Sequence, residues 1–314
     1  MAPAMMKLGP LAVSRLGFGT LSLSPLQSSL EVEQGAELLC YAWHRGVKFW
    51  DTAQIYDNYP VLLAALRRLP QPPVIATKTY AYTAAAAQVA VEEARRALGL
   101  DVLDLMMLHE QEALTLPGHK PALDWLVEAR ERGLIRAVGV STHSVACVLA
   151  AAEMPEFDVI HPLYNKWGVG IHDGSPGDMA AAIAKAKELG KGIYAMKVLG
   201  GGTLYRQADE AIVHVLAQPW LDSAVIGMAT RAEVDYNLAL FQGRKPDEEI
   251  ARQVGRRGRS LYIADWCQGC GQCVQACGQG ALVMAEGRVT VNPKLCILCG
   301  YCSRRCQHMC LKII

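Results

Sequence analysis

The chain has 314 residues, of which 52% are hydrophobic and 19% charged, and its formal net charge is +1 at pH 7. This composition supports a sizeable core in one or two domains, and the balanced charge excludes the strong field typical of proteins that bind nucleic acid or membrane surfaces. Because no apolar run reaches the roughly 18 residues of a membrane span, and MAPAMMKLGP lacks a secretory pattern, we expect a cytoplasmic protein without a membrane span.

Short apolar runs alternate with helical patterns over residues 13–243. A strand at 13–20 follows a small hairpin near 7–12, and seven strand-like runs come after it. These runs are 47–51, 74–78, 102–108, 135–141, 157–161, 192–197 and 223–228. The helical patterns lie near 31–45, 59–69, 84–98, 120–132, 144–153, 178–189, 208–217 and 231–243. Eight strands that are each followed by a helix predict an α/β fold, a (β/α)8 TIM barrel. A doubly wound sheet is less favoured because no G-x-G-x-x-G follows the first strand.

Titratable residues end three successive predicted strands. Asp51, Lys78 and His109 end the second, third and fourth strands, and Tyr56 lies in the loop five residues beyond Asp51. Each alone has an ordinary explanation as a strand-end cap or a solvated side chain. Together they describe a tyrosine that acts as general acid in carbonyl reduction, since Lys78 can pair with Asp51 and His109 can hydrogen-bond the phenol. We expect the charge of Lys78 to lower the pKa of Tyr56 from about 10.

On these four residues the sequence resembles the aldo-keto reductase family, from about Leu8 to Phe241. GVSTH at 139–143 and YN at 164–165 resemble its strand-five and strand-six motifs, and LGGG at 199–202 and IGMATRAEVDYN at 226–237 resemble its dinucleotide-binding loops. The resemblance implies NADP(H), with Arg231 at the 2′-phosphate and Glu233 and Asn237 at the adenine. The residues that it assigns to the cofactor are Ser141, Thr142, His161, Asn165, Met196, Lys197, Gly200, Gly201, Gly227, Met228, Arg231, Glu233 and Asn237.

Departures from the family pattern gather around the nicotinamide. Thr142 stands where many members have Asn, His161 where Gln usually binds the carboxamide, and Met196, followed by Lys197, where a tyrosine usually stacks on the ring. Methionine can still pack against a ring and histidine can still hydrogen-bond an amide, so NADP(H) remains the expected cofactor.

Two connecting segments have open interpretations. The loop at 163–176 carries Trp167, His172 and Asp173, and it either shapes the substrate pocket or is a surface excursion. Residues 244–259 contain six basic and three acidic residues and are expected to form a charged helix or linker. We therefore divide the chain into a barrel (1–243), a basic linker (244–260) and a C-terminal domain (261–314).

Nine of the eleven cysteines lie after Trp266, and eight of these form C-x2-C-x2-C-x3-C twice, with two short strands expected at 281–291. This is the bacterial two-cluster ferredoxin pattern, in which the fourth cysteine of each run binds the other cluster. Zinc favours separated pairs and disulfides favour secreted chains, so both are weaker alternatives. The pattern predicts an α+β ferredoxin-like domain whose two [4Fe–4S] clusters are bound by Cys267, Cys270, Cys273 and Cys306, and by Cys296, Cys299, Cys302 and Cys277. Cys310 is left over, and a core thiol is its simplest interpretation.

Three functions stay open. The first is NADP(H)-dependent reduction of a small carbonyl substrate, or the reverse, with Tyr56 as acid. In the second function, the clusters deliver single electrons to a substrate at the barrel mouth. We consider it because hydride carries two electrons, whereas each cluster ordinarily passes one. The third is an electron-transfer or docking protein with an inactive barrel, against which the intact tetrad argues. The basic excess of 244–314 favours an acidic ferredoxin or flavodoxin as partner, although ordinary surface charge explains it equally well.

Overall fold

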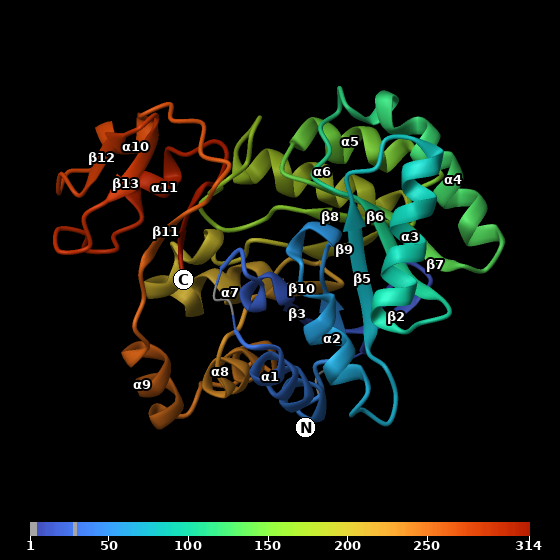
Figure 1. Cartoon of the computed structure of the whole chain (residues 1–314), viewed down its shortest axis with the longest axis horizontal. Coiled ribbons are helices and arrows are strands. Elements are labelled where there is room, and N and C mark those ends of the chain that lie inside the picture. The colour runs from blue at the N-terminus through green and yellow to red at the C-terminus, as the bar shows by residue number, and fades with distance from the viewer. Residues whose placement is uncertain (1–4, 28–29) are drawn as a thin grey trace.

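Within residues 5–27 and 30–314, which the computed structural model describes, eight parallel strands close into a barrel surrounded by helices (Figure 1). Strands follow one another around it in chain order, and the last pairs with the first. They are β3 (Leu16–Gly19), β4 (Phe49–Asp51), β5 (Val74–Thr79), β6 (Leu103–Leu108), β7 (Ile135–Thr142), β8 (Val159–Pro162), β9 (Gly192–Ala195) and β10 (Ser223–Ile226). The predicted barrel is confirmed.

Helices follow the strands close to their predicted positions. They are α1 (Val32–His44), α2 (Tyr59–Leu66), α3 (Ala84–Leu98), α4 (Lys120–Glu131), α5 (Val145–Glu153), α6 (Pro176–Glu188), α7 (Ala208–Leu216) and α8 (Arg231–Phe241). Short 3-10 turns join them at η1 (Thr20–Leu23), η2 (Gln54–Tyr56), η3 (Leu116–His119), η4 (Gly200–Gly202) and η5 (Tyr205–Gln207). The local signals of α3 are typical: the Thr83 hydroxyl accepts from the Ala86 N–H at 3.2 Å, and Gly99 ends the helix at φ 65°.

The N-terminal end of the barrel is closed by the hairpin of β1 (Met5–Leu8) and β2 (Leu11–Ser14). Leu8, Leu11 and Val13 are fully or almost fully buried and join the cluster of side chains inside the barrel. Met309, far along the chain, belongs to the same cluster. Since the hairpin covers one end, the functional residues must be sought at the C-terminal ends of the strands.

The linker and the C-terminal residues form smaller elements. They are α9 (Glu248–Arg256), β11 (Leu261–Ile263), α10 (Gln272–Gln275), β12 (Leu282–Ala285), β13 (Arg288–Val291), α11 (Tyr301–Arg304) and β14 (Leu311–Ile313). β11 pairs antiparallel with β14, and β12 pairs with β13 as predicted. We call residues 261–314 the cysteine-rich part. It lies to one side of the barrel mouth (Figure 1), and β14 runs back to η4.

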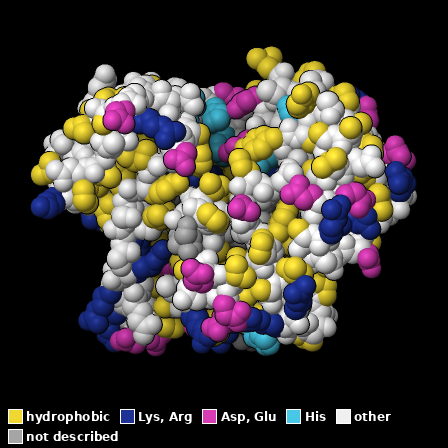
Figure 2. All heavy atoms as spheres, viewed as in Figure 1, with side chains coloured by type: hydrophobic (Ala, Val, Ile, Leu, Met, Phe, Trp, Pro, Cys, Tyr) yellow, Lys and Arg dark blue, Asp and Glu magenta, His cyan; other side chains and the backbone are white. Residues whose placement is uncertain are grey.

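Most basic side chains of the linker lie on the protein surface. Lys and Arg side chains gather over α9, and histidine side chains reach the surface between the cysteine-rich part and the barrel (Figure 2). None of the described helices is both long and apolar enough to cross a membrane.

Candidate functional site

A buried ion pair joins β4 and β5 where these strands end. The Lys78 ammonium lies 2.7 Å from Asp51 Oδ1 and donates to the Thr52 carbonyl at 2.7 Å. The Tyr194 hydroxyl on β9 donates to the same carboxylate at 2.9 Å. Burial lowers the pKa of Lys78, although the charge of Asp51 opposes the shift. The carboxylate on the apolar strand face therefore has the cation that its burial demands.

Tyr56 lies in η2 beside this pair. Its ring centroid is 5.1 Å from the Lys78 ammonium and 5.8 Å from the ring centroid of His109. The prediction that Lys78 lowers the pKa of Tyr56 is wrong. Burial raises that pKa well above 10, and the charges of Asp51 and Glu110 raise it further. Because Asp51 neutralises Lys78, burial decides the direction, and the phenol stays protonated at neutral pH.

His109 follows β6 and stacks on Tyr80 with ring centroids 4.5 Å apart. Its Nδ1 is buried and has no hydrogen-bond partner in the described part of the chain. Burial, with help from the charge of Lys78, lowers the pKa of His109 to about 3. The imidazole is therefore neutral at physiological pH, and its free nitrogen can bind an oxygen of a substrate.

Two cavities meet at Tyr56. The glycine-loop cavity, of about 200 Å³, extends along η4 toward β10. The histidine cavity, of about 390 Å³, lies between the barrel mouth and the cysteine-rich part. Tyr56, Leu21, Lys197 and Lys312 line both. The remaining polar residues of the histidine cavity include Tyr80, His109, Glu110, Glu112, His143, His172 and His308.

Only part of the predicted cofactor set meets in the glycine-loop cavity. Residues that line it are His161, Met196, Lys197, Gly201, Gly227 and Glu233. Residues outside its lining are Ser141, Thr142, Asn165, Gly200, Met228, Arg231 and Asn237. Some of these have local partners: Ser141 accepts the N–H of Glu110 at 2.8 Å, and Arg231 lies 3.8 Å from Glu37. Their roles toward a cofactor stay predictions.

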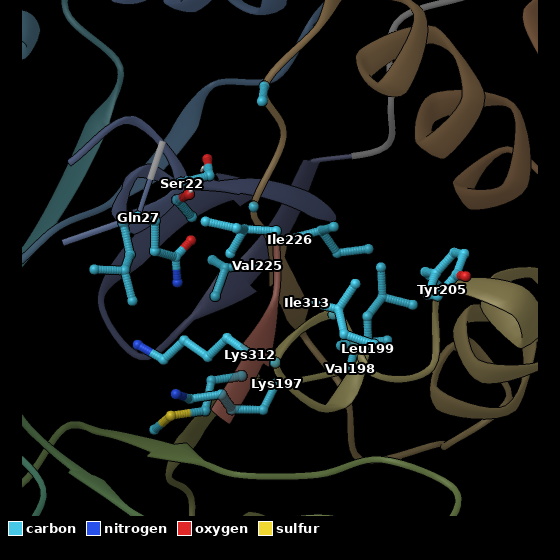
Figure 3. Close-up of a pocket in the computed structure, with 18 of the residues that line it drawn as sticks. Ser22, Gln27, Lys197, Val198, Leu199, Tyr205, Val225, Ile226, Lys312 and Ile313 are labelled. Carbon is cyan, nitrogen blue, oxygen red and sulfur yellow. Dashed lines mark hydrogen bonds between the residues drawn. The ribbon is translucent and has the colours of Figure 1, made fainter. Parts of the chain in front are cut away.

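Sequence reasoning missed the cations that the linker and the C-terminus bring to this cavity. Arg257 and Arg259 line it, and Arg257 donates to Glu233 at 2.6 Å. The carboxylate assigned to the adenine is thus already paired. Lys312 and Ile313 of β14 reach in beside Val198, Leu199, Val225 and Ile226 (Figure 3). The basic run at 244–259 was the available signal for the arginines, and Lys312 was visible only as part of the basic excess of the C-terminal domain.

A nicotinamide dinucleotide fits this cavity only in part. Residues suited to contact the nicotinamide ring are present, because His161, Met196 and Tyr56 line the cavity. The glycine loop is covered, however: a Cβ placed on Gly202, which has φ 86°, would lie 1.9 Å from the Ile313 carbonyl oxygen. The volume of about 200 Å³ is also below the roughly 300 Å³ at which pockets for drug-sized ligands begin. β14 therefore narrows the glycine-loop cavity beside Gly202.

The predicted cluster ligands line two smaller cavities. One contains Cys267, Cys270, Cys273 and Cys306. The other contains Cys277, Cys296, Cys299 and Cys302. Cys277 and Cys306, the fourth cysteines of their runs, each accept at 3.3 Å the N–H of the residue four positions later. No three or more His, Cys, Asp or Glu side chains of the described residues could hold a single metal ion. Four spaced thiolates suit a [4Fe–4S] cluster, whose irons each take one.

One residue connects the first of these cysteine cavities with the barrel mouth. His308 lines both that cavity and the histidine cavity. The Trp266 indole donates to the His308 carbonyl at 3.2 Å, and the Lys312 ammonium lies 4.6 Å from the Trp266 ring centroid. The cysteine-rich part therefore forms one wall of the histidine cavity.

Residues of the loop after β8 make different contacts. His172 lines the histidine cavity, and its Nδ1 is 2.6 Å from Glu112. Asp173 instead caps α5 by accepting the N–H groups of Val145 and Ala146 at 2.6 and 3.0 Å. Trp167 is outside the lining.

Comparison with known proteins agrees with this architecture. Residues 15–215 match the Aldo/keto reductase family, and residues 261–283 match the 4Fe-4S binding domain. The chain therefore belongs to the aldo-keto reductase family, whose members are oxidoreductases, and it carries a 4Fe–4S binding domain.

Individual relatives are distant. A D-threo-aldose 1-dehydrogenase from a Pseudomonas species is 25% identical over 188 residues, covering 48% of this chain and 56% of the relative. The chain spans about half the length of the curated relatives it matches. An aldo-keto reductase from Bacillus halodurans in its holo form has a TM-score of 0.66 at 18% identity, covering 81% of this chain and 96% of that one. One from Klebsiella pneumoniae, in complex with NADPH, has a TM-score of 0.62 at 20% identity, covering 82% and 95%. These two structures support the fold alone.

Proposed function

We propose that this protein reduces a small carbonyl compound at the barrel mouth, with Tyr56 as the proton donor. The observation that carries the proposal is the position of Tyr56, which lines both cavities beside the Lys78–Asp51 pair. Its raised pKa keeps the proton on the phenol until a substrate oxygen takes it.

The residues divide the work of the reaction. The carbonyl oxygen accepts a hydrogen bond from the Tyr56 hydroxyl and contacts the neutral imidazole of His109. As the carbonyl carbon gains the equivalent of a hydride, which is two electrons and one proton, the oxygen takes the phenolic proton, and C=O becomes H–C–O–H. The phenolate left on Tyr56 lies near the Lys78 ammonium, which stabilises it. Asp51 accepts from that ammonium and is itself held by the Tyr194 hydroxyl. In the opposite direction the same groups accept a proton from an alcohol.

NADP(H) is the donor typical of the family, and the Klebsiella pneumoniae relative is in complex with NADPH. When bound, it supplies hydride. His161, Met196 and Lys197 would hold its ring, and Arg257 would meet its adenosine end. Because the glycine-loop cavity is small, the whole dinucleotide enters only if Ile313 and Ile314 of the C-terminal strand shift.

A second function is favoured by His308, which lines both the histidine cavity and the cavity of Cys267 and Cys306. Here the cysteines that line the two cysteine cavities would hold two [4Fe–4S] clusters, which would supply single electrons from an outside donor. Each reduction at the barrel mouth takes two electrons and two protons. Arg304 and Arg305 are exposed in the cysteine-rich part, and they suit an acidic ferredoxin or flavodoxin as donor.

One anaerobic experiment separates the two donors. Protein with about eight irons and eight sulfides per chain, as two clusters require, is mixed with a carbonyl compound and either NADPH or a reduced low-potential ferredoxin. Turnover with NADPH alone, at constant cluster absorbance, supports the hydride route. Turnover only with the ferredoxin, accompanied by cluster bleaching and recovery, supports the second function.

Tyr56→Phe tests the role that both routes share. The variant should lose carbonyl reduction by about 10²- to 10⁴-fold while keeping its iron content and circular dichroism spectrum. Tyr82→Phe is the matched control, since Tyr82 is 63% exposed and outside the lining of both cavities. Comparable turnover in the two variants would assign the proton to another acid.

A further inference from the structure

Two ammonium groups that line the histidine cavity have no carboxylate within ion-pair distance among the described residues. Lys197 follows β9 and Lys312 lies on β14, and their amines point the same way (Figure 3). Neither amine makes a hydrogen bond or ion pair with any described residue. Lys312 is 2% exposed, and its ammonium lies over the ring of Trp266. Lys197 has φ 57°, in the left-handed region that is costly for a residue with a side chain.

The acidic groups nearby do not balance these two charges. Asp51 is paired with Lys78, and Glu112 lies 2.6 Å from His172. Glu110 accepts from the Tyr80 hydroxyl and is a single charge shared between two ammonium groups. Burial lowers the pKa of Lys312 to about 7, and repulsion from Lys197 contributes in spite of Glu110. This region therefore carries more positive than free negative charge on a buried lysine, Lys312, and a half-buried one, Lys197, and such charge is costly without an anion.

A third donor faces the same space. His143 is 5% exposed and lines the histidine cavity, and its buried Nε2 has no hydrogen-bond partner among the described residues. The nearest carboxylate oxygen, on Glu110, is 3.8 Å away. Because burial holds its pKa near 3, His143 is a neutral imidazole that can donate one hydrogen bond. An unpaired buried donor beside two unpaired cations marks a binding site rather than a packing surface.

We propose that Lys197, Lys312 and His143 bind a carboxylate or phosphate group of the carbonyl substrate, so that the substrate class is a small anionic aldehyde or ketone. This inference rests on the proposed carbonyl reduction. The anion lies in the same cavity as Tyr56 and His109, and a volume of about 390 Å³ suits a small metabolite. The glycine-loop cavity, which Lys312 also lines, offers an anion no free arginine, because Arg257 and Arg259 lie 2.6 and 3.9 Å from Glu233. That contrast favours the substrate over the phosphates of a cofactor.

Binding is tested first without turnover. Sodium succinate and inorganic phosphate are titrated calorimetrically into cluster-loaded wild type, Lys312→Met, Lys312→Arg and Lys294→Met. Because Lys312→Met loses a charge-assisted hydrogen bond, its affinity for the anion that the site binds should fall by about 10- to 100-fold. Lys312→Arg should retain the wild-type affinity for that anion. Lys294 is exposed in the same part of the chain, so its variant controls for the lost charge. Equal affinity in wild type and Lys312→Met, or equal weakening by Lys294→Met, overturns the proposal.

Turnover then identifies the anion. Succinic semialdehyde is compared with butanal, and glyceraldehyde 3-phosphate with glyceraldehyde. For the preferred anion, the ratio of kcat/KM between charged and neutral partners should fall about 10-fold or more in Lys312→Met. If Lys312→Met lowers the affinity for NADPH and leaves both kcat/KM ratios unchanged, the lysines bind the cofactor and the proposal is overturned. If wild type reduces none of the four compounds, the proposed function has failed for them, while the calorimetric result still decides on the anion site.

Discussion

The two cavities on either side of Tyr56 differ in what lines them. The glycine-loop cavity is largely aliphatic around β10 and β14, whereas the histidine cavity gathers four histidines, two acids and two lysines. Both include ends of barrel strands, and both include Lys312 from the C-terminal strand. In the proposed reaction the barrel would supply the proton chemistry at their junction. The cysteine-rich part contributes Lys312 to the lining of both cavities.

The largest effect is expected at the buried ion pair beside Tyr56. Lys78→Met leaves the buried Asp51 carboxylate without its cation, which should cost about 3–5 kcal/mol in the free energy of unfolding. Arg136→Met is the control: it breaks a 2.7 Å pair with Asp104, but Arg136 is 51% exposed, so about 1 kcal/mol or less is expected. Denaturant unfolding followed by circular dichroism measures both. Similar losses of unfolding free energy in the two variants would show that the buried Lys78–Asp51 pair contributes no more to stability than an exposed pair.

A second prediction concerns the strand that narrows the glycine-loop cavity. Gly202 and Gly190 both have φ 86°, but a Cβ on Gly202 meets the Ile313 carbonyl whereas one on Gly190 meets nothing within 4 Å. Gly190→Ala should cost about 1–2 kcal/mol from backbone strain alone. Gly202→Ala should cost more and displace β14.

Thermal melts and limited proteolysis at the C-terminus measure this pair of variants. A displaced β14 should also change the affinity for NADPH, which is followed by fluorescence. Indistinguishable stability and proteolysis in Gly202→Ala and Gly190→Ala would mean that β14 is not held against the glycine loop in solution.

The third prediction sharpens the assignment of the cofactor's phosphate. Arg257 lines the glycine-loop cavity, while Arg231 lies outside the lining and near Glu37. Arg257→Ala should lower the affinity for NADPH about 10-fold, since a hydrogen bond to a charged group contributes about 1.5–3 kcal/mol. Arg231→Ala should change it about twofold or less. NADH is titrated in parallel, and a larger NADPH-specific loss in Arg231→Ala would restore the assignment made from the sequence.

The smallest expected effect is that of pH on the chemical step. The pKa of His109 is about 3 and that of Tyr56 lies well above 10, so acidification from pH 8 to 6 protonates neither His109 nor a phenolate. If the chemical step limits turnover, kcat measured at saturating substrate should therefore vary about twofold or less over this range. An acid limb near pH 6.5 that disappears in His109→Asn would show that this histidine titrates in the working enzyme.

The sequence was sufficient for the barrel because its strands and helices are local patterns. It was also sufficient to bring Asp51, Tyr56, Lys78 and His109 together, since strand ends of one barrel share one face. It could not give the sign of the Tyr56 pKa shift, which depends on how deeply the ring is buried.

Long-range docking sets the other limit. Lys312 and His308 reach the barrel mouth only because β14 lies against η4. No spacing or periodicity in the chain encodes that contact, so neither residue could be recognised in advance. Arg257 was visible as part of a charge run, but its pairing with Glu233 was not.

The position of Met309 affects how the protein should respond to oxygen. It packs in the barrel interior, and it lies three residues after Cys306, a predicted cluster ligand, and three before Lys312. This short stretch ties the cysteine cavity, the barrel core and the substrate side of the mouth together. We therefore expect oxygen damage to the cluster of Cys306 to loosen Met309 and Lys312. Carbonyl turnover should then decline in step with that cluster, even when the electrons come from NADPH.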